Sequence, residues 1–150
     1  MQAEELFSTL LSANNDVRAQ AEQVYSGLFQ TPQSVIPFHV QAFSSPNESV
    51  RLLAASLLSR YFYQVSPSLF AFLNPQQQAE FKQLLLERIA SPAPPALLRA
   101  FSSLIHDVFT QTPSYPNLIE TLTRLSKADS PSHRAIALTT LSTLVLFAET

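Results

Sequence analysis

The chain is poor in cysteine and in glycine. Its 150 residues include no cysteine and one glycine, Gly27. Without cysteine the chain cannot form disulfides, use a thiolate nucleophile or hold zinc through sulfur. A single glycine is too few for a loop that cradles phosphate, and sheet-rich folds use more glycine in their hairpin turns. The eleven prolines are instead typical of helices that begin at proline.

Charge is also scarce, and no long apolar run is present. Charged residues make up 13% of the chain, against about 25% in an average domain. The net charge of −2 supplies no basic patch, so we expect no nucleic-acid partner. The first residues include Glu4, Glu5 and Asp16 and lack a secretory leader. The stretch 138–148 is too short and too rich in Ser and Thr to span a bilayer, so we expect a soluble, intracellular chain without a membrane partner.

An arginine recurs at the start of apolar-periodic segments. The four copies are Arg18, Arg51, Arg99 and Arg134, at spacings of 33, 48 and 35 residues. Self-similarity at periods of 20 to 50 residues is the signature of a solenoid of stacked repeats. The sequence therefore predicts a repeat architecture, whose function depends on its surfaces.

The residues that follow each arginine fit one face of a helix. Positions three, six, seven and ten after the arginine share a face at about 100° per residue. With two exceptions, His106 and Thr140, these positions are small or apolar: Ala21, Val24, Tyr25, Leu28; Ala54, Leu57, Leu58, Tyr61; Ser102, Ile105, Phe109; Ala137, Leu141, Leu144. We expect this face to be the buried one in all four copies.

The pattern predicts an all-α fold, an α-α superhelix of the HEAT/armadillo type with about four antiparallel helix pairs. The expected repeats cover residues 2–30, 32–63, 75–112 and 115–150. Helices are expected at 3–12, 17–29, 48–63 and 116–128, and from Pro32, Pro75, the end of the Ser91–Pro95 linker and Pro131. Because the last helix shows no glycine or proline to stop it, we expect the chain to be a fragment of a longer solenoid.

Two irregularities are expected within this scheme. Pro37 falls inside a helical pattern that opens at Pro32, where it should kink the helix. Residues 64–74 interrupt the period and account for the 48-residue spacing. Because this insert is apolar, with Leu69 and Phe70 among its residues, we expect it to pack down as a short turn of helix.

No arrangement of catalytic or metal-ligating residues is evident. His39, His106 and His133 are isolated from one another and from any ligand-spaced carboxylate. His106 and Asp107 are consecutive, so they project about 100° apart on a helix, which is poor geometry for an acid–base pair. We therefore expect no enzymatic activity and no cofactor. A small all-α enzyme is the least favoured of three functional classes.

The four arginines are expected to be structural. An arginine at a helix start opposes the helix dipole, so packing or pairing explains its recurrence better than ligand contact does. We expect Arg18, Arg51, Arg99 and Arg134 to pair with carboxylates or carbonyls of neighbouring repeats.

Two segments resemble a known family. V-R-A-Q-A-E-Q-V-Y, at 17–25, resembles the R-x-x-A-E-x-x-L signature at the start of importin-β (karyopherin-β) proteins. V-R-L-L-A-A-S-L-L-S-R-Y-F, at 50–62, is similar to a segment of their second repeat. The turn before residue 17 is similar to that of the importin five branch. The resemblance covers about the first 65 residues, and the low charge, the many serines and the insert at 64–74 depart from the family.

The resemblance implies the amino-terminal HEAT repeats of a nuclear transport receptor. Such a receptor shuttles between cytoplasm and nucleus, carries protein cargo with nuclear localisation signals past nucleoporins, and binds the GTPase Ran in its GTP form. It also implies that the second helices line the inner surface. Positions one, five and eight after each arginine, with flanking residues, then form the candidate Ran-binding face: Gln20, Gln23, Ser26, Leu52, Ser56, Ser59, Arg60, Leu104 and Asp107. The alternative is a HEAT scaffold that holds together another complex, such as a phosphatase or chromosome complex.

Overall fold

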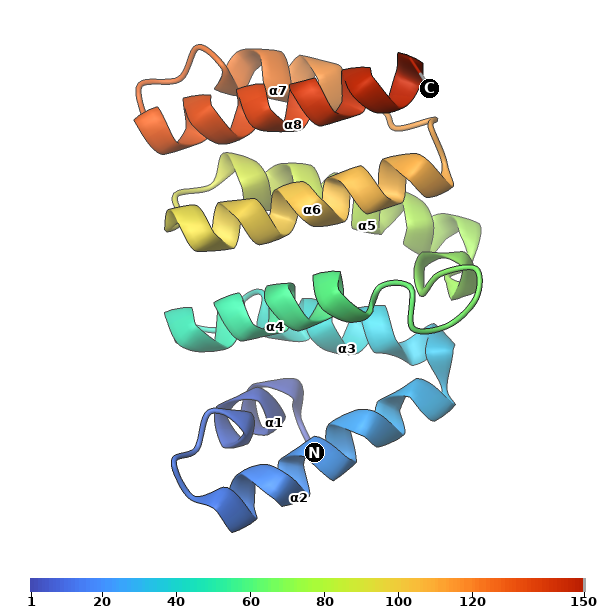
Figure 1. Cartoon of the computed structure of the whole chain (residues 1–150), viewed down its shortest axis with the longest axis vertical. Coiled ribbons are helices and arrows are strands. Elements are labelled where there is room, and N and C mark those ends of the chain that lie inside the picture. The colour runs from blue at the N-terminus through green and yellow to red at the C-terminus, as the bar shows by residue number, and fades with distance from the viewer. Residues whose placement is uncertain (150) are drawn as a thin grey trace. The chain divides into compact units, whose positions relative to one another are not determined.

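The computed structural model describes residues 1–149, with side chains to residue 146. Over this range the chain forms eight α-helices, three short 3-10 helices and no strand (Figure 1). The elements are α1 (Ala3–Leu10), α2 (Asn15–Gly27), η1 (Leu28–Gln30), η2 (Pro32–Ser34), α3 (Val35–Ala42), α4 (Glu48–Tyr61), η3 (Phe70–Phe72), α5 (Pro75–Ala90), α6 (Pro95–Gln111), α7 (Leu118–Leu125) and α8 (Pro131–Glu149). The all-α prediction is confirmed for these residues.

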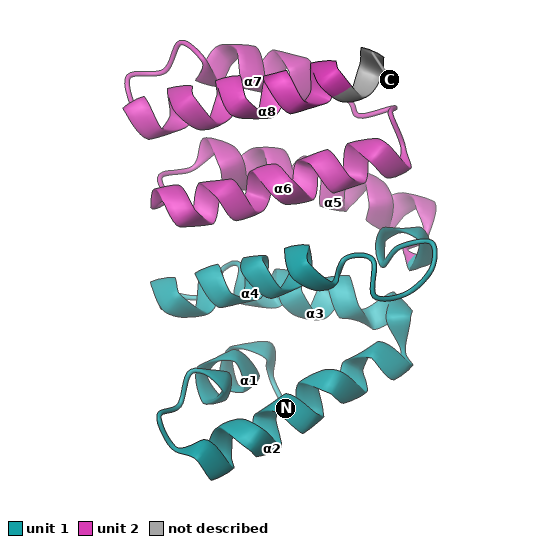
Figure 2. Cartoon of the chain, viewed as in Figure 1, with its two compact units in different colours: residues 1–72 teal, residues 73–150 magenta. Residues whose placement is uncertain are grey.

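The chain divides into two compact units, coloured separately in Figure 2. The first unit spans Met1–Phe72, and the second begins at Leu73. In the first unit α1 packs on α2 and α3 on α4, and α1 also contacts α3 and α4. In the second unit α5 packs on α6 and α7 on α8, while α6 lies along α8. Each unit therefore contains two helix pairs, and we call α2, α4, α6 and α8 the second helices.

The core of the first unit is rich in aromatic residues. Phe7, Phe43 and Phe62 are fully buried. The ring of Phe7 also lies 6.1 Å from that of Tyr25 and 5.2 Å from that of His39, between ring centroids. Such tilted and edge-on ring pairs add to the free energy that burial of their apolar area provides.

The core of the second unit is mostly aliphatic. Leu85, Ile89 and Leu104 are fully buried, and Phe101 is 2% exposed. Thr140 is also fully buried. Its hydroxyl is bonded twice, donating to the carbonyl of Ile136 on its own helix and lying 2.6 Å from the Ser102 hydroxyl on α6. These bonds remove the cost of burying a hydroxyl where an apolar side chain was expected.

Prolines mark helix starts, as the sequence predicts, and side-chain caps add to them. Pro75, Pro95 and Pro131 each occupy the first position of a helix, where the missing N–H has no partner to lose. Before α5, the Asn74 side chain accepts from the Gln77 N–H while the Gln77 side chain accepts from the Asn74 N–H. This capping box satisfies two donors that the helix leaves open.

The kink predicted at Pro37 is wrong. The segment begins as the 3-10 helix η2, and α3 starts only at Val35. Pro37 is therefore the third residue of α3, where the backbone N–H has no partner within the helix. The proline ring consequently fits the first turn without breaking a helical hydrogen bond.

The insert at 64–74 packs down, as expected. Leu69 and Phe70 are buried, and the Leu69 N–H donates to the Phe62 carbonyl at 2.8 Å. The 3-10 helix η3 forms the expected short turn. Among the described residues, no helix combines the length and apolarity that a bilayer crossing requires.

Candidate functional site

Turns of the same kind precede the two second helices of the first unit, α2 and α4. Before α2, the Ser12 hydroxyl accepts from the Asn14 N–H at 3.1 Å, and the Asn14 side chain accepts from the Asp16 and Val17 N–H groups. Before α4, the Ser45 hydroxyl accepts from the Asn47 N–H at 3.0 Å. The Asn47 side chain then accepts from the Ser49 N–H at 2.9 Å. Asparagine is among the best residues for this capping role.

The recurring arginine closes this turn. Arg18 and Arg51 are each the fourth residue of their helix. Their guanidinium groups reach back and donate to the carbonyls of Ser12 at 3.2 Å and Ser45 at 2.6 Å. These carbonyls follow a helix end, where acceptors are left open, and a cation there is favoured by the dipole of the preceding helix. The two turns share the sequence S-x-N-x-x-V-R, and we call this arrangement the arginine clasp.

A related clasp opens α8. Arg134 is again the fourth residue of its helix, and it donates to the Ala128 and Asp129 carbonyls at 2.7 and 2.8 Å. In all three clasps the acceptors belong to the turn of the arginine's own helix pair. The predicted pairing with neighbouring repeats is therefore wrong for Arg18, Arg51 and Arg134. Each side chain instead donates to backbone carbonyls five or six residues earlier, in the turn that precedes its own helix.

Arg99 forms no clasp. It is the fifth residue of α6, and Leu98 is the fourth. Arg99 is exposed, and it has no hydrogen bond or ion pair within the described part of the chain. The linker before α6 ends in prolines and offers no Ser-x-Asn turn. The pairing predicted for Arg99 is not found among the described residues, where this arginine lies one residue out of register with the other three.

The predicted partner face is mostly exposed on the first unit. On α2, Gln20, Gln23 and Ser26 are all exposed. On α4, Ser56 and Arg60 are exposed, whereas Leu52 and Ser59 are half-buried. These side chains offer amides, hydroxyls and one guanidinium, a set that can form hydrogen bonds with a protein surface but supplies neither a general base nor a metal ligand set.

On α6 the prediction of this face is wrong. Leu104 was expected to be exposed but is 0% exposed, and Ala100 is 9% exposed. Counting from Leu98 instead of Arg99 moves the face by one residue, to Arg99, Ser103 and His106. Arg99 and Ser103 are exposed and His106 is half-buried. Leu104 is thus a core residue, and it leaves the candidate site.

A signal for this shift is present in the sequence. From Leu98, positions three, six, seven and ten are Phe101, Leu104, Ile105 and Val108, which are all apolar and all buried. From Arg99, the same positions include Ser102 and His106. The polar residue at His106 therefore shows that the helix register counted from Arg99 is wrong. The polar residue at Thr140 stands at a position that is buried, as expected.

Asp107, the remaining candidate on α6, is half-buried. The His106 Nδ1 atom lies 3.8 Å from the Asp107 Oδ1 atom. Consecutive helix residues diverge by about 100°, so this pair is formed by side chains bending toward each other along the surface.

The buried polar groups of the first unit are structural. His39 is fully buried, and its Nδ1 atom lies 2.7 Å from the Val35 carbonyl. Because a carbonyl only accepts, Nδ1 carries the proton, and Nε2 accepts from the Tyr25 hydroxyl at 2.8 Å. Burial lowers the pKa of His39 to about 4, against a weaker opposing effect of the bond to Val35, and burial raises the pKa of Tyr25. Both side chains are therefore neutral at pH 7, and neither is positioned to act on a ligand.

His133 is bonded on both ring nitrogens. Its Nδ1 atom lies 2.9 Å from the Ser130 hydroxyl, and its Nε2 atom lies 2.8 Å from the Ser91 carbonyl. The ring thereby ties the start of α8 to the linker before α6. His39 and His133 are thus each satisfied within the fold, in keeping with the isolation of the histidines in the sequence.

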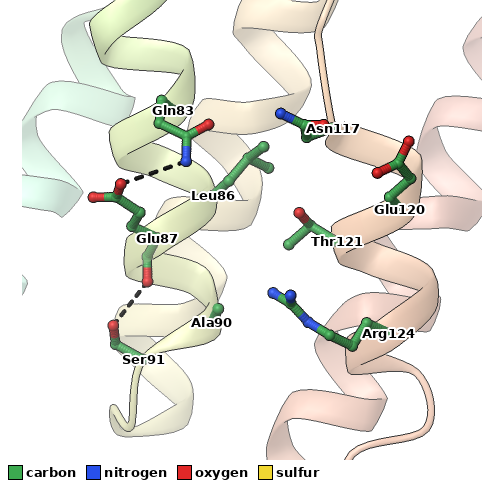
Figure 3. Close-up of a pocket in the computed structure, with 9 residues that line it drawn as sticks. All are labelled: Gln83, Leu86, Glu87, Ala90, Ser91, Asn117, Glu120, Thr121 and Arg124. Atoms are coloured by element: carbon green, nitrogen blue, oxygen red, sulfur yellow. Dashed lines mark hydrogen bonds between the residues drawn. The ribbon is translucent and has the colours of Figure 1, made fainter.

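A groove between α5 and α7 was missed by sequence reasoning. It encloses about 570 Å³, and its walls are Gln83, Leu86, Glu87, Ala90 and Ser91 on one side and Asn117, Glu120, Thr121 and Arg124 on the other (Figure 3). Gln83 donates to Glu87 along α5 at 3.4 Å. The groove brings two carboxylates and one guanidinium together, so its surface suits a polar segment more than an apolar ligand.

No described group of residues forms a metal site. Histidine and carboxylate side chains do not gather into sets of three or more that could hold a metal ion in the described part of the chain. Every fully buried side-chain N or O atom up to residue 146 has a hydrogen-bond partner. No family model and no curated protein matches the chain.

Proposed function

We propose that the chain is the amino-terminal part of a nuclear transport receptor, a segment of a HEAT-type solenoid that binds the GTPase Ran in its GTP form. In this proposal the chain is a binding module without catalysis of its own. It contributes to carrying protein cargo between cytoplasm and nucleus, with Ran binding coupled to cargo release.

One observation carries this proposal. The two segments that resemble the importin-β family, 17–25 and 50–62, lie at equivalent places in two helix pairs of one unit. Both follow the same Ser-x-Asn turn and carry the same arginine clasp. The resemblance therefore falls on repeated units rather than on two unrelated helices.

The exposed face of these helices suits a folded partner. Gln20, Gln23, Ser56 and Arg60 are exposed and few of them carry charge, so the face does not repel a protein surface. Arginine is enriched among the residues that dominate interface energies. For cargo release, Ran must bind the cargo-free form more tightly than the cargo-bound form, since only differential affinity shifts such an equilibrium.

Calorimetric titration of the chain with Ran loaded with GTP or GDP tests the proposal. We expect binding to the GTP form only, weakened about tenfold by Arg60→Glu, which corresponds to about 1.4 kcal/mol. The matched control is Arg124→Glu, which changes another exposed arginine, on α7, and should leave the affinity unchanged. Equal binding of both nucleotide forms, or of neither, would favour the scaffold of another complex.

A further inference from the structure

The groove between α5 and α7 lies wholly within the second unit and is elongated. Its main hollow of about 570 Å³ falls in the size range of ligand-binding clefts. A second hollow of about 210 Å³, which shares Gln83 as a wall, continues it toward Pro75 at the start of α5. The two hollows follow α5 over most of its 16 residues, a length of roughly 24 Å at 1.5 Å per residue. A surface of this length suits a linear chain better than a compact molecule.

One side of α7 turns three hydrogen-bond donors into the groove. Asn117, Thr121 and Arg124 are spaced by four and three residues, so they lie on the same side of the helix. Figure 3 shows their side chains pointing from α7 toward α5. Within the described part of the chain, none of the three side chains has a hydrogen-bond or ion-pair partner. The groove is therefore lined on this side by donors that can accept a ligand.

Thr121 is nearly buried, and its hydroxyl is unpaired. The residue is 9% exposed, and a threonine within a helix commonly donates to the carbonyl one turn earlier. Thr140 does so, to the carbonyl of Ile136, whereas the Thr121 hydroxyl makes no such bond among the described residues. Because polar groups in enclosed positions usually have partners, this hydroxyl indicates a ligand that enters the groove.

Asn117 stands immediately before α7 in a left-handed conformation, at φ 66°. Asn14 and Asn47 cap their helices with their side chains, the usual role of asparagine at this position. The Asn117 side chain does not cap α7. Its amide instead points into the groove (Figure 3), where it can donate to an acceptor of a ligand.

The opposite wall is apolar where it faces these donors. Leu86 and Ala90 point from α5 toward α7, whereas the Glu87 carboxylate points the other way (Figure 3). On α7 the Glu120 carboxylate is directed toward the start of the helix, away from Arg124. The Arg124 guanidinium is therefore the charge that faces the middle of the groove, and it favours an anionic partner group.

We propose that this groove binds an extended peptide segment of a protein partner through an Asp or Glu side chain of that segment. The carboxylate pairs with the Arg124 guanidinium, a contact that is frequently bidentate. Main-chain carbonyls of the segment accept from Thr121 and Asn117, and a small apolar side chain covers Leu86 and Ala90. The groove is formed by first helices, while the proposed Ran-binding face lies on second helices, so either proposal can fail without the other.

Nuclear magnetic resonance titration of the 150-residue chain with the blocked peptide acetyl-Ser-Ala-Glu-Ala-Ser-amide tests this proposal. We expect saturable shifts of the amide signals of Leu86, Ala90 and Thr121 and of the Arg124 Nε–H signal. The dissociation constant should be on the order of 1 mM, the strength of one charged and two or three neutral hydrogen bonds. Peptides with Gln or Lys in place of Glu should bind at least about tenfold more weakly, because neither offers Arg124 a carboxylate.

Variants of the chain assign the binding to the groove. Arg124→Gln should weaken binding of the Glu peptide about tenfold. Asn117→Gly should weaken it about threefold, since glycine tolerates the left-handed backbone but removes one neutral donor. The matched control, Arg99→Gln, changes another exposed arginine without a partner among the described residues, and it should bind like the wild type. All three variants should keep the far-UV circular dichroism of the wild type.

Three results would each overturn the proposal. The first is the absence of saturable shifts in the groove with the Glu peptide. The second is equal or tighter binding of the Gln or Lys peptide, which would show that the groove does not select a carboxylate. The third is an Arg124→Gln variant that keeps the wild-type dissociation constant, which would place the peptide elsewhere on the chain.

Discussion

Acid should weaken the first unit because His39 is buried there in its neutral form. Its pKa falls from 6.5 in the unfolded chain to about 4 in the folded protein, chiefly because burial disfavours the charged ring. Below about pH 6.5 the unfolded state therefore binds a proton that the folded state refuses, so the free energy of unfolding decreases as the pH falls. The loss begins near pH 6.5 and is complete below about pH 4.

The magnitude follows from the two pKa values. Their separation corresponds to about 3 kcal/mol of stability lost between about pH 7 and pH 4. This is a large fraction of the 5–15 kcal/mol that typical domains have. The buried His39 ring is thus expected to contribute to the acid sensitivity of the first unit.

Urea unfolding followed by circular dichroism, at several pH values, measures the effect. The matched variant is His39→Gln, whose side chain stays neutral and whose amide oxygen can accept from the Tyr25 hydroxyl. Because the two proteins differ only at residue 39, the wild-type minus variant difference isolates His39. From pH 7 to pH 4 the free energy of unfolding of the wild type should fall by about 3 kcal/mol more than that of the variant. A difference that stays constant with pH would refute the reasoning.

Two further predictions concern the second helices. Arg51→Met should lower the free energy of unfolding by about 1–2 kcal/mol, because it removes a charged donor from the Ser45 carbonyl. The control Arg99→Met should change it by less than about 0.5 kcal/mol. Equal losses for the two variants in urea unfolding would contradict a stabilising role of the arginine clasp. Leu104→Ala truncates a core side chain and should lower the free energy of unfolding by about 2–5 kcal/mol. A loss below about 0.5 kcal/mol would indicate that Leu104 is exposed, as the sequence analysis expects.

Most helix starts could be predicted from the sequence because their signals are local. Pro75 and Pro131 need only their own missing N–H to favour a first helical position. Asn14 and Asn47 cap with their own side chains. The prediction at Pro37 is wrong because a proline kinks a helix interior but suits a first turn, and a shift of a few residues in the helix start decides between the two.

The position of the arginine alone does not predict the register of α6. Arg18 and Arg51 take the fourth helix position because a Ser-x-Asn turn holds an acceptor for them. The proline linker before α6 has no such turn, so nothing there fixes Arg99 to that position. The apolar positions around Leu98 carry the register more reliably, since burial constrains every one of them.

The groove between α5 and α7 could not be predicted. Its charged residues, Glu87, Glu120 and Arg124, come from helices that are far apart in the chain and share no local pattern. Only the packing of one helix pair beside the next brings them together. Sites of this kind depend on tertiary contacts, which a periodicity in one helix does not encode.

Nuclear magnetic resonance of the isotope-labelled chain, titrated with Ran in its GTP form, tests the central claim most directly. The account predicts that amide signals of Gln20, Gln23, Ser56 and Arg60 shift or broaden, while those of the first helices α1 and α3 do not. Ran in its GDP form, as the matched control, should leave all of these signals in place. Signals that remain unchanged with the GTP form, or that change mainly on α1 and α3, would contradict it.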